Sequence, residues 1–319
     1  MLKTFEQAAA LIGEKKLLHI SGSGKLLRNL PDGNWIGGST EYFMEENGGQ
    51  ISDTLLDVQE LAFGTYKLAS YGTAELPSIT TDAYPNGFSV IILPFDSEVH
   101  RQYAQNAADY DNIFLKNIVG WISGLNLNAP EQIPIAVNGS TGEAFADKAV
   151  VLHISLPEDK TVCMSIVNIF TPDANSPLIT FGADGFNTET CLVDGKEVVF
   201  ADYIAENGLD TKLPLVGDYS GAGINISIKS IDGGTVHFYA PVFKGIQYRF
   251  AESIPDYAAA FNEKIKELGG ADAEFSCNCI LNFLYGELEG KKLGGFYGPI
   301  TFGEIAWQLL NQTLVYLRI

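Results

Sequence analysis

Two glycine-rich turns in the first half of the chain carry residue types that suit the binding of a small charged molecule. They read Gly-Ser-Thr-Glu at residues 38–41 and Gly-Ser-Thr-Gly-Glu at residues 139–143. Glycine lets a ligand approach the backbone closely, amides and hydroxyls can bind an anion, and a carboxylate can hold an amine. This combination suits a zwitterion such as an amino acid. The alternative is structural, with each segment ending a strand in a tight turn before a helix cap.

Ser276 and Cys277 are the candidate nucleophiles of an alternative, enzymatic hypothesis of acyl-transfer or hydrolytic type. Such a nucleophile needs a base within hydrogen-bonding reach. The four histidines, however, lie in unrelated sequence contexts: His19, His100, His153 and His237. The sequence also contains no His-Glu-x-x-His or Gly-x-Ser-x-Gly motif. We therefore assign no catalytic residue and expect that the protein is not an enzyme.

Neither a metal nor a cofactor is expected. Cys277 and Cys279 form a Cys-x-Cys pair, but a zinc site needs about four ligands and no other cysteine or histidine is grouped with them. These thiols are expected to be reduced, buried and structural. The loop at Ser21–Lys25 departs from a phosphate-binding loop, because the first glycine would fall at His19 and Leu26 follows the lysine. An ordinary strand-to-helix turn is expected there.

The composition is that of a folded and strongly acidic protein. Hydrophobic residues make up 46% and charged residues 18% of the 319 residues, and the formal net charge is −19. A surface this negative repels phosphate backbones and anionic membranes, so we expect neither nucleic acid nor a membrane as partner. No apolar run approaches the roughly 18 residues of a membrane span, and the first residues lack the apolar stretch of a signal peptide. A cytoplasmic location is expected.

Helices mixed with hairpins must position the candidate residues. Apolar periodicity predicts helices at residues 5–12, 25–30, 113–125 and 257–268, the last ended by Gly269-Gly270. Strands are predicted at residues 17–21, 34–40 and 88–93, with a helix cap at Asp96 or Ser97 after the third. Hairpins are predicted for residues 149–156 with 161–169, for the turn Asp194-Gly195, and for residues 224–229 with 235–240. This mixture indicates an α+β fold of mixed, largely antiparallel sheets with flanking helices.

The two Gly-Ser-Thr turns also form an internal echo. Each follows an apolar strand that a helix precedes. The echo fits an internal duplication that relates two halves of the chain, and similarities of six residues also arise by chance. Both interpretations stay open.

Short phrases along most of the chain resemble the FIST domain, an intracellular sensory module. Besides the two turns, they are Asp194-Gly195-Lys196, Ala-Pro-Val-Phe-Lys-Gly at residues 240–245, Phe275-Ser276-Cys277, Gly303-Glu304-Ile305 and Asn311-Gln312-Thr313. They follow the family's order, and the C-terminal third matches best. Two departures bear on the ligand: the phrase at residues 275–277 leads to Asn278 rather than arginine, and Leu310 stands where histidine is common.

The resemblance implies a sensory FIST N-like half at residues 1–188 and a FIST C-like half at residues 189–319. It implies a cytoplasmic, non-enzymatic sensor in signal transduction that binds a small ligand, such as an amino acid or related metabolite, and works with a separate signalling partner protein. The site is expected between the halves, with these ligand-binding residues: Thr40, Glu41, Ser140, Thr141, Glu143, Tyr297 and Glu304. Hydroxyls and amides would take a carboxylate, and Glu143 or Glu304 an ammonium group. An interaction scaffold without a pocket is the third hypothesis.

Overall fold

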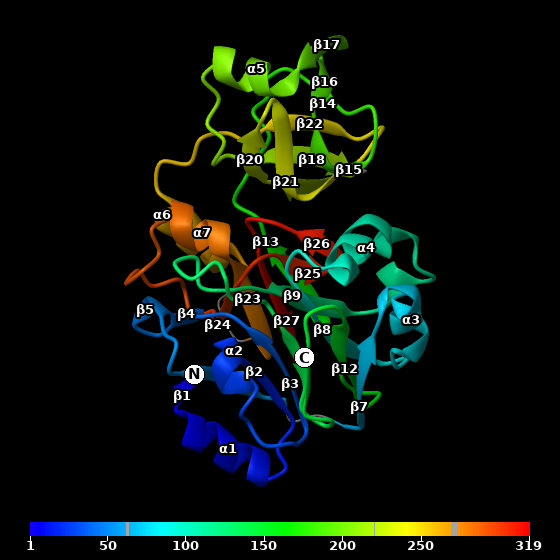
Figure 1. Ribbon diagram of the computed structural model, residues 1–319, viewed down its shortest axis with the longest axis vertical. Coiled ribbons are helices and arrows are strands. Elements are labelled where there is room, and N and C mark those ends of the chain that lie inside the picture. The colour runs from blue at the N-terminus through cyan, green and yellow to red at the C-terminus, as the bar shows by residue number, and fades with distance from the viewer. Residues whose placement is uncertain (62–63, 220, 269–272) are drawn as a thin grey trace.

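A larger body and a smaller insert make up the protein (Figure 1). The computed structural model describes residues 1–61, 64–219, 221–268 and 273–319. The chain builds most of the body first, leaves it after β13 to form the insert at residues 170–254, and then returns to complete the body. The predicted α+β class is confirmed.

Three six-stranded sheets form the body. The first has the order β1 (Leu2–Lys3), β6 (Leu56–Glu60), β2 (Leu18–Gly22), β3 (Trp35–Ser39), β10 (Ala136–Asn138), β11 (Glu143–Phe145). The second has the order β7 (Tyr66–Tyr71), β12 (Ala149–Ser155), β8 (Gly87–Pro94), β9 (Ile118–Ser123), β25 (Glu304–Ala306), β26 (Gln308–Leu310). The third has the order β13 (Cys163–Val167), β27 (Leu314–Arg318), β23 (Phe275–Cys279), β24 (Gly298–Thr301), β4 (Tyr42–Glu45), β5 (Gly48–Ile51).

One strand pattern recurs in all three sheets. The two central strands are parallel in each: β2 with β3, β8 with β9, and β23 with β24. A hairpin from a different part of the chain then completes each sheet: β10–β11 the first, β25–β26 the second, and β4–β5 the third. None of the three sheets is therefore complete without a segment that follows a central strand of another sheet.

This threefold pattern differs from the predicted relation between the two Gly-Ser-Thr turns. The first turn follows the central strand β3, whereas the second follows β10, which belongs to an exchanged hairpin. The equivalent positions are the last residues of the second central strands, Ser39, Ser123 and Thr301, and all three are buried. The predicted boundary between residues 188 and 189 falls inside the insert.

The helices lie on the sheets and at their ends (Figure 1). They are α1 (Phe5–Gly13), α2 (Gly24–Leu27), α3 (Ser78–Asp82), α4 (Glu98–Asn106), α5 (Phe200–Glu206), α6 (Tyr257–Glu267) and α7 (Ile280–Tyr285), with 3-10 turns at η1 (Thr73–Glu75), η2 (Ala107–Asp109) and η3 (Ile113–Leu115). Ser97 caps α4 and Asp256 caps α6 through side-chain hydrogen bonds, as their residue types favour. The predicted end of the last long helix at Gly269-Gly270 lies outside the described residues. Among the described helices, none has the length and apolar character that crossing a membrane requires.

The prediction of a helix at residues 113–125 is wrong. Only η3 is helical there, and Ile118–Ser123 forms the strand β9, every residue of which is buried. A strand buried on both faces is apolar throughout, so its local pattern does not distinguish it from a buried helix. The predicted hairpin of residues 149–156 with 161–169 is also wrong, because β12 and β13 lie in different sheets.

The insert contains a six-stranded and a three-stranded sheet. Their orders are β17 (Lys196–Val199), β16 (Thr190–Val193), β14 (Ile179–Thr180), β22 (Gln247–Phe250), β18 (Leu215–Tyr219), β19 (Ala222–Ile226), and β15 (Gly185–Thr188), β21 (Thr235–Val242), β20 (Ile228–Asp232). The predicted turn at Asp194-Gly195 is confirmed, with φ of 47° and 80°. The predicted strand at residues 224–229 is divided, since β19 pairs with β18 and β20 with β21.

Candidate functional site

The two Gly-Ser-Thr turns lie at opposite ends of β3. Strand β10 runs antiparallel to β3, so the turn after β10 lies beside Trp35, where Gly139 N donates to the Trp35 carbonyl. The turn of Thr40 and Glu41 follows the other end of β3. Four residue steps of a strand span about 13 Å. The two turns therefore do not face one cavity.

Thr40 and Glu41 are buried and their polar atoms already have protein partners. Thr40 Oγ1 donates to the Ile300 carbonyl at 2.7 Å. The two Glu41 carboxylate oxygens accept from Asn126 Nδ2 at 2.6 Å and Gln132 Nε2 at 3.3 Å. Glu41 lines a cleft of about 530 Å³ at the carboxyl ends of β2 and β3, together with Lys25. These hydrogen bonds hold segments of the body together.

The other predicted residues are spread over the surface and the core. Ser140 and Thr141 are exposed in the β10–β11 turn, and Glu143 is exposed at the start of β11. Tyr297 is 36% exposed next to the start of β24. Glu304 is fully buried. The structure therefore does not bring the predicted set together.

The Glu304 carboxyl group is hydrogen-bonded to two neighbouring threonines of the body. Its Oε2 accepts from Thr313 Oγ1 at 2.8 Å, and its Oε1 lies 3.1 Å from Thr301 Oγ1. Burial raises the pKa of Glu304 to about 8, although these hydrogen bonds oppose the shift. Thr301 Oγ1 also lies 3.2 Å from the Asn278 carbonyl. When Glu304 is protonated, its hydroxyl donates to Thr301 Oγ1, and the single Thr301 hydrogen is then donated to the Asn278 carbonyl. A neutral, enclosed carboxyl does not match the predicted partner of a ligand ammonium group.

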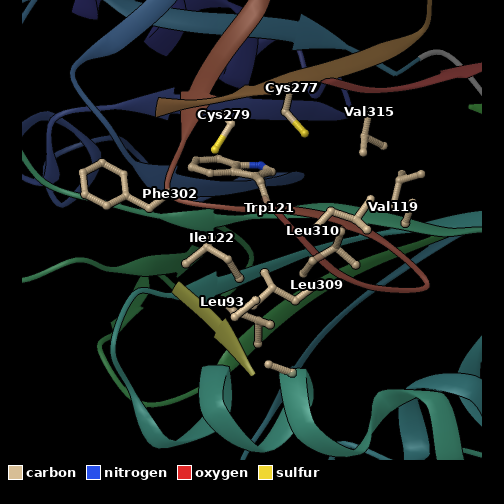
Figure 2. Close-up of a cluster of buried hydrophobic side chains, with 14 of the residues drawn as sticks. Leu93, Val119, Trp121, Ile122, Cys277, Cys279, Phe302, Leu309, Leu310 and Val315 are labelled. Carbon is tan, nitrogen blue, oxygen red and sulfur yellow. The ribbon is translucent and has the colours of Figure 1, made fainter. Parts of the chain in front are cut away.

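The candidate nucleophiles are also enclosed. Figure 2 shows Cys277 and Cys279 in the hydrophobic core beside the indole of Trp121. The Cys277 thiol donates to the Gly120 carbonyl at 3.4 Å, and Ser276 Oγ donates to the Tyr297 carbonyl at 2.7 Å. Burial raises the pKa of both thiols well above the usual range. In the described part of the chain, neither nucleophile is hydrogen-bonded to a histidine.

A polar pocket lies where the body meets the insert, with a volume of about 250 Å³. The body contributes residues that follow β8, and the insert contributes residues of β15, β20 and β21: Phe95, Asp96, His100, Arg101, Phe186, Asn187, Lys229, His237, Phe238 and Tyr239. Among the described residues, no group of three or more His, Cys, Asp or Glu side chains could hold a metal ion.

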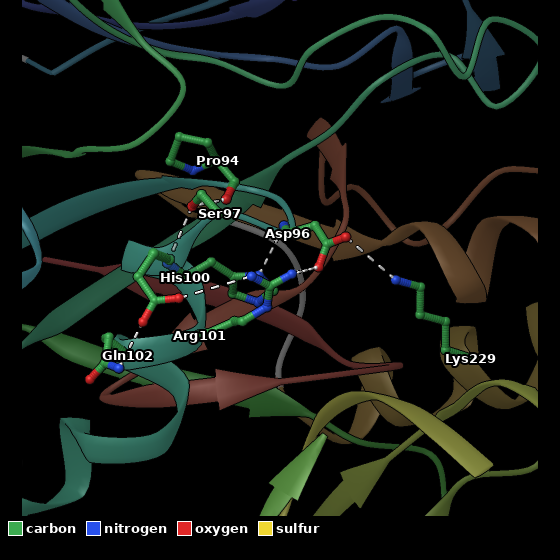
Figure 3. Close-up of polar contacts among 8 residues, drawn as sticks. Pro94, Asp96, Ser97, His100, Arg101, Gln102 and Lys229 are labelled. Atoms are coloured by element: carbon green, nitrogen blue, oxygen red, sulfur yellow. Dashed lines mark hydrogen bonds and ion pairs between the residues drawn. The ribbon is translucent and has the colours of Figure 1, made fainter. Parts of the chain in front are cut away.

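Asp96 links the two parts of the molecule across this pocket (Figure 3). One carboxylate oxygen lies 2.7 Å from Arg101 Nη2, and the other lies 3.8 Å from Nζ of Lys229 in the insert. Ser97 Oγ donates to the Pro94 carbonyl at 2.6 Å and accepts from His100 N at 3.3 Å. The cap of α4 thereby places His100 against the pocket.

His100 has one ring nitrogen without a protein partner. Its Nδ1 accepts from Asp96 N at 3.2 Å, so the neutral ring carries its proton on Nε2. His100 is 3% exposed, and Nε2 is buried with no hydrogen-bonding protein atom in reach. The rings of Phe95 and Phe186 pack against the imidazole at centroid distances of 5.8 and 6.1 Å. Burial lowers the pKa of His100 to about 4, with Asp96 opposing and Arg101 and Lys229 adding to the shift.

An apolar pocket of about 520 Å³ lies further along α4, also between body and insert. Its walls are mainly aromatic and aliphatic: Ala104, Gln105, Ala108, Asp109, Phe114, Ile166, Tyr219, Ala222, Ile224, Phe243, Lys244, Ile246, Ala306, Trp307, Gln308 and Leu310. Trp307 is fixed, since its indole N–H donates to the Lys116 carbonyl at 2.7 Å and its carbonyl accepts from Tyr103. Tyr219 packs edge-on against Phe243 at 6.2 Å. Contacts within the body and within the insert therefore fix the aromatic side chains that line the pocket.

Comparison with family models matches residues 3–319 to a family of unknown function, DUF6976. The chain belongs to this family. The resemblance to the FIST domain is therefore wrong, and the sensory and signalling role that rested on it has lost its basis. No curated protein and no solved structure matches this DUF6976 member.

The phrases behind that resemblance have structural roles in this DUF6976 chain. The Phe275–Cys277 segment belongs to a buried central strand, and Asn311–Thr313 is buried directly before β27. Short combinations of glycine, hydroxyl and aromatic residues meet such packing needs in many folds.

Both pockets were missed from the sequence of this DUF6976 member. One available signal was the predicted cap at Asp96 or Ser97, which follows the carboxyl end of a predicted strand. In open α/β sheets, binding sites lie at such ends of parallel strands. Lys229 and Phe186 come from an insert about a hundred residues away, and the sequence contained no signal for that approach.

Proposed function

We propose that this protein binds a small molecule with an apolar body in the apolar pocket between body and insert, without acting on it as an enzyme. The observation that carries the proposal is a cavity of about 520 Å³ with aromatic walls contributed by both parts of the molecule. Small-molecule sites typically have volumes of about 300–1,000 Å³, are mainly apolar and lie at domain interfaces.

The polar groups around this pocket support an amphipathic ligand. Asp109, Lys244 and Gln308 line it alongside the aromatic walls. Asp109 and Lys244 are exposed, so they can meet a polar end of the ligand in water. An aromatic amino acid or a related aromatic metabolite has both features.

Phe114 gives the proposal further support. It lines the pocket, packs on Trp307 at a centroid distance of 6.3 Å, and is still 56% exposed. An aliphatic or aromatic ligand would remove part of this apolar surface from water, which stabilises the complex by about 25 cal/mol per Å².

A thermal-shift screen of aromatic amino acids and aromatic metabolites tests the proposal. A ligand at about 100 times its Kd stabilises the folded state by about 2.7 kcal/mol. Ala222 is exposed in β19 and lines the pocket, so we expect Ala222→Trp to fill the cavity and abolish the shift. Ala10→Trp, at an exposed site on α1, is the matched control and should leave the shift intact. No shift in the folded wild type, or an equal shift in Ala222→Trp, would contradict the proposal.

A further inference from the structure

The polar pocket holds a hydrogen-bond donor without an acceptor, while its nearby acceptors already have partners. Asp96 faces Arg101 through one carboxylate oxygen and Lys229 through the other. His100 Nδ1 is used by Asp96 N, which leaves the Nε2–H group of His100 without a protein acceptor. A buried donor without an acceptor destabilises the folded state. The pocket therefore favours a guest that brings an acceptor.

The charge around the pocket favours a negative guest. The lining holds two cations, Arg101 and Lys229, against the single carboxylate of Asp96. Glu98 lies outside the lining, 4.0 Å from Arg101, and reduces this excess at the mouth of the pocket. The chain as a whole has a net charge of −19, whereas the lining of this pocket is net positive. The pocket is therefore a favourable position for an anion.

The walls favour an organic anion over an inorganic one. Phe95 contacts both polar partners, since Lys229 Nζ lies 5.1 Å from its ring centroid and the His100 ring 5.8 Å away. Phe186 closes on the imidazole from the insert. Aromatic faces pack against a carbon skeleton, whereas inorganic phosphate would lose its hydration against them without compensation.

We propose that the polar pocket is a second binding site, specific for a small organic carboxylate. One carboxylate oxygen accepts from His100 Nε2–H and faces the Lys229 ammonium group, and the carbon body packs on Phe95 and Phe186. The site is separate from the apolar pocket, so either proposal can fail without the other.

Calorimetric titration with benzoate, acetate and inorganic phosphate tests this site in the whole 319-residue chain. His100→Asn keeps an acceptor near the Nδ1 position and removes Nε2, so we expect at least a tenfold loss of benzoate affinity. His100→Gln, which places an amide N–H near the Nε2 position, should recover part of it. We expect Lys229→Met to weaken benzoate, while Lys196→Met, an exposed lysine on β17, should not.

Four outcomes decide the question. Benzoate binding that persists in Ala222→Trp and is lost in His100→Asn supports the proposal. Binding that is lost only in Ala222→Trp places benzoate in the apolar pocket and overturns it. Phosphate that binds in preference to benzoate overturns the organic carboxylate. No binding of benzoate or acetate at millimolar concentration to folded wild-type protein also overturns it, since the pocket then accommodates only water.

Discussion

His153 and His100 are both buried histidines of the body, and burial lowers the pKa of each to about 4. Their surroundings differ. His153 lies in β12, where Nδ1 is 2.8 Å from Ser89 Oγ and Nε2 is 2.8 Å from the Tyr71 hydroxyl. His100 has a protein partner for Nδ1 alone. Residue type and burial are the same in both. His100 differs in that Nε2 has no protein partner and that its ring lines the polar pocket.

The presence or absence of protein hydrogen-bond partners also distinguishes the predicted binding residues from His100 in the polar pocket. Thr40, Glu41 and Glu304 have residue types that suit a ligand, but neighbouring segments of the body already satisfy them. The sequence does not distinguish His100 from the other histidines, because a missing hydrogen-bond partner depends on neighbours in space. We expect that the partnered groups stabilise the fold and that the unpartnered Nε2 of His100 is dispensable for it.

The largest effect is expected for Glu304→Ala. This substitution leaves the Thr313 hydroxyl and amide without their acceptor and opens a cavity in the core. We expect a loss of about 2–5 kcal/mol in the free energy of unfolding, measured by urea denaturation. Glu143→Ala, at an exposed carboxylate, is the control and should change little. Equal, small effects would show that the Glu304 network is not a structural element.

The pH dependence of stability tests whether Glu304 is protonated in the folded chain. Its pKa is raised from 4.5 to about 8 in the folded chain, so below pH 4.5 it is protonated in both states. Between these values the unfolded chain has released the proton and the folded chain still holds it. Stability therefore falls as the pH rises, by up to about 1.4 kcal/mol per pH unit.

Glu304→Gln removes this titration. The unfolding free energy of the wild type minus that of the variant should decrease from pH 5 to pH 8 and then level off. Urea unfolding at unit pH intervals measures it, and the subtraction cancels the other titrating groups. A difference that stays constant over this range would mean that Glu304 is ionised in the folded chain.

The smallest effects separate the two histidines. His153→Asn keeps an acceptor near Nδ1 and deletes the contact of Nε2 with the Tyr71 hydroxyl, which should cost about 1–3 kcal/mol. His100→Asn removes the same atoms, but the lost Nε2 has no protein partner, so the cost should be lower by about 1 kcal/mol or more. The same ring atoms are deleted at both sites, and His153 additionally loses its hydrogen bond to Tyr71. Urea unfolding measures the difference between the two costs. A larger cost for His100→Asn would break the comparison.

Local chemistry made part of this molecule predictable. The cap at Ser97 and the turn at Asp194-Gly195 depend on residues close in sequence, and both were predicted from residue type. The α+β class followed from the same signals. The polar pocket was predictable only as far as the α4 cap, since that cap also positions His100.

Tertiary structure decided the rest. The pattern of β9 fits a buried helix as well as a buried strand, and only pairing with β8 and β25 separates the two. The exchange of hairpins among three sheets depends on pairing between residues far apart in the chain. The local spacing of apolar residues contains no information on such pairing. The sequence by itself thus determined local caps and turns and the fold class. The fold alone decided which buried polar groups have partners and that Lys229 and Phe186 face His100, because hydrogen-bond satisfaction depends on neighbours in space.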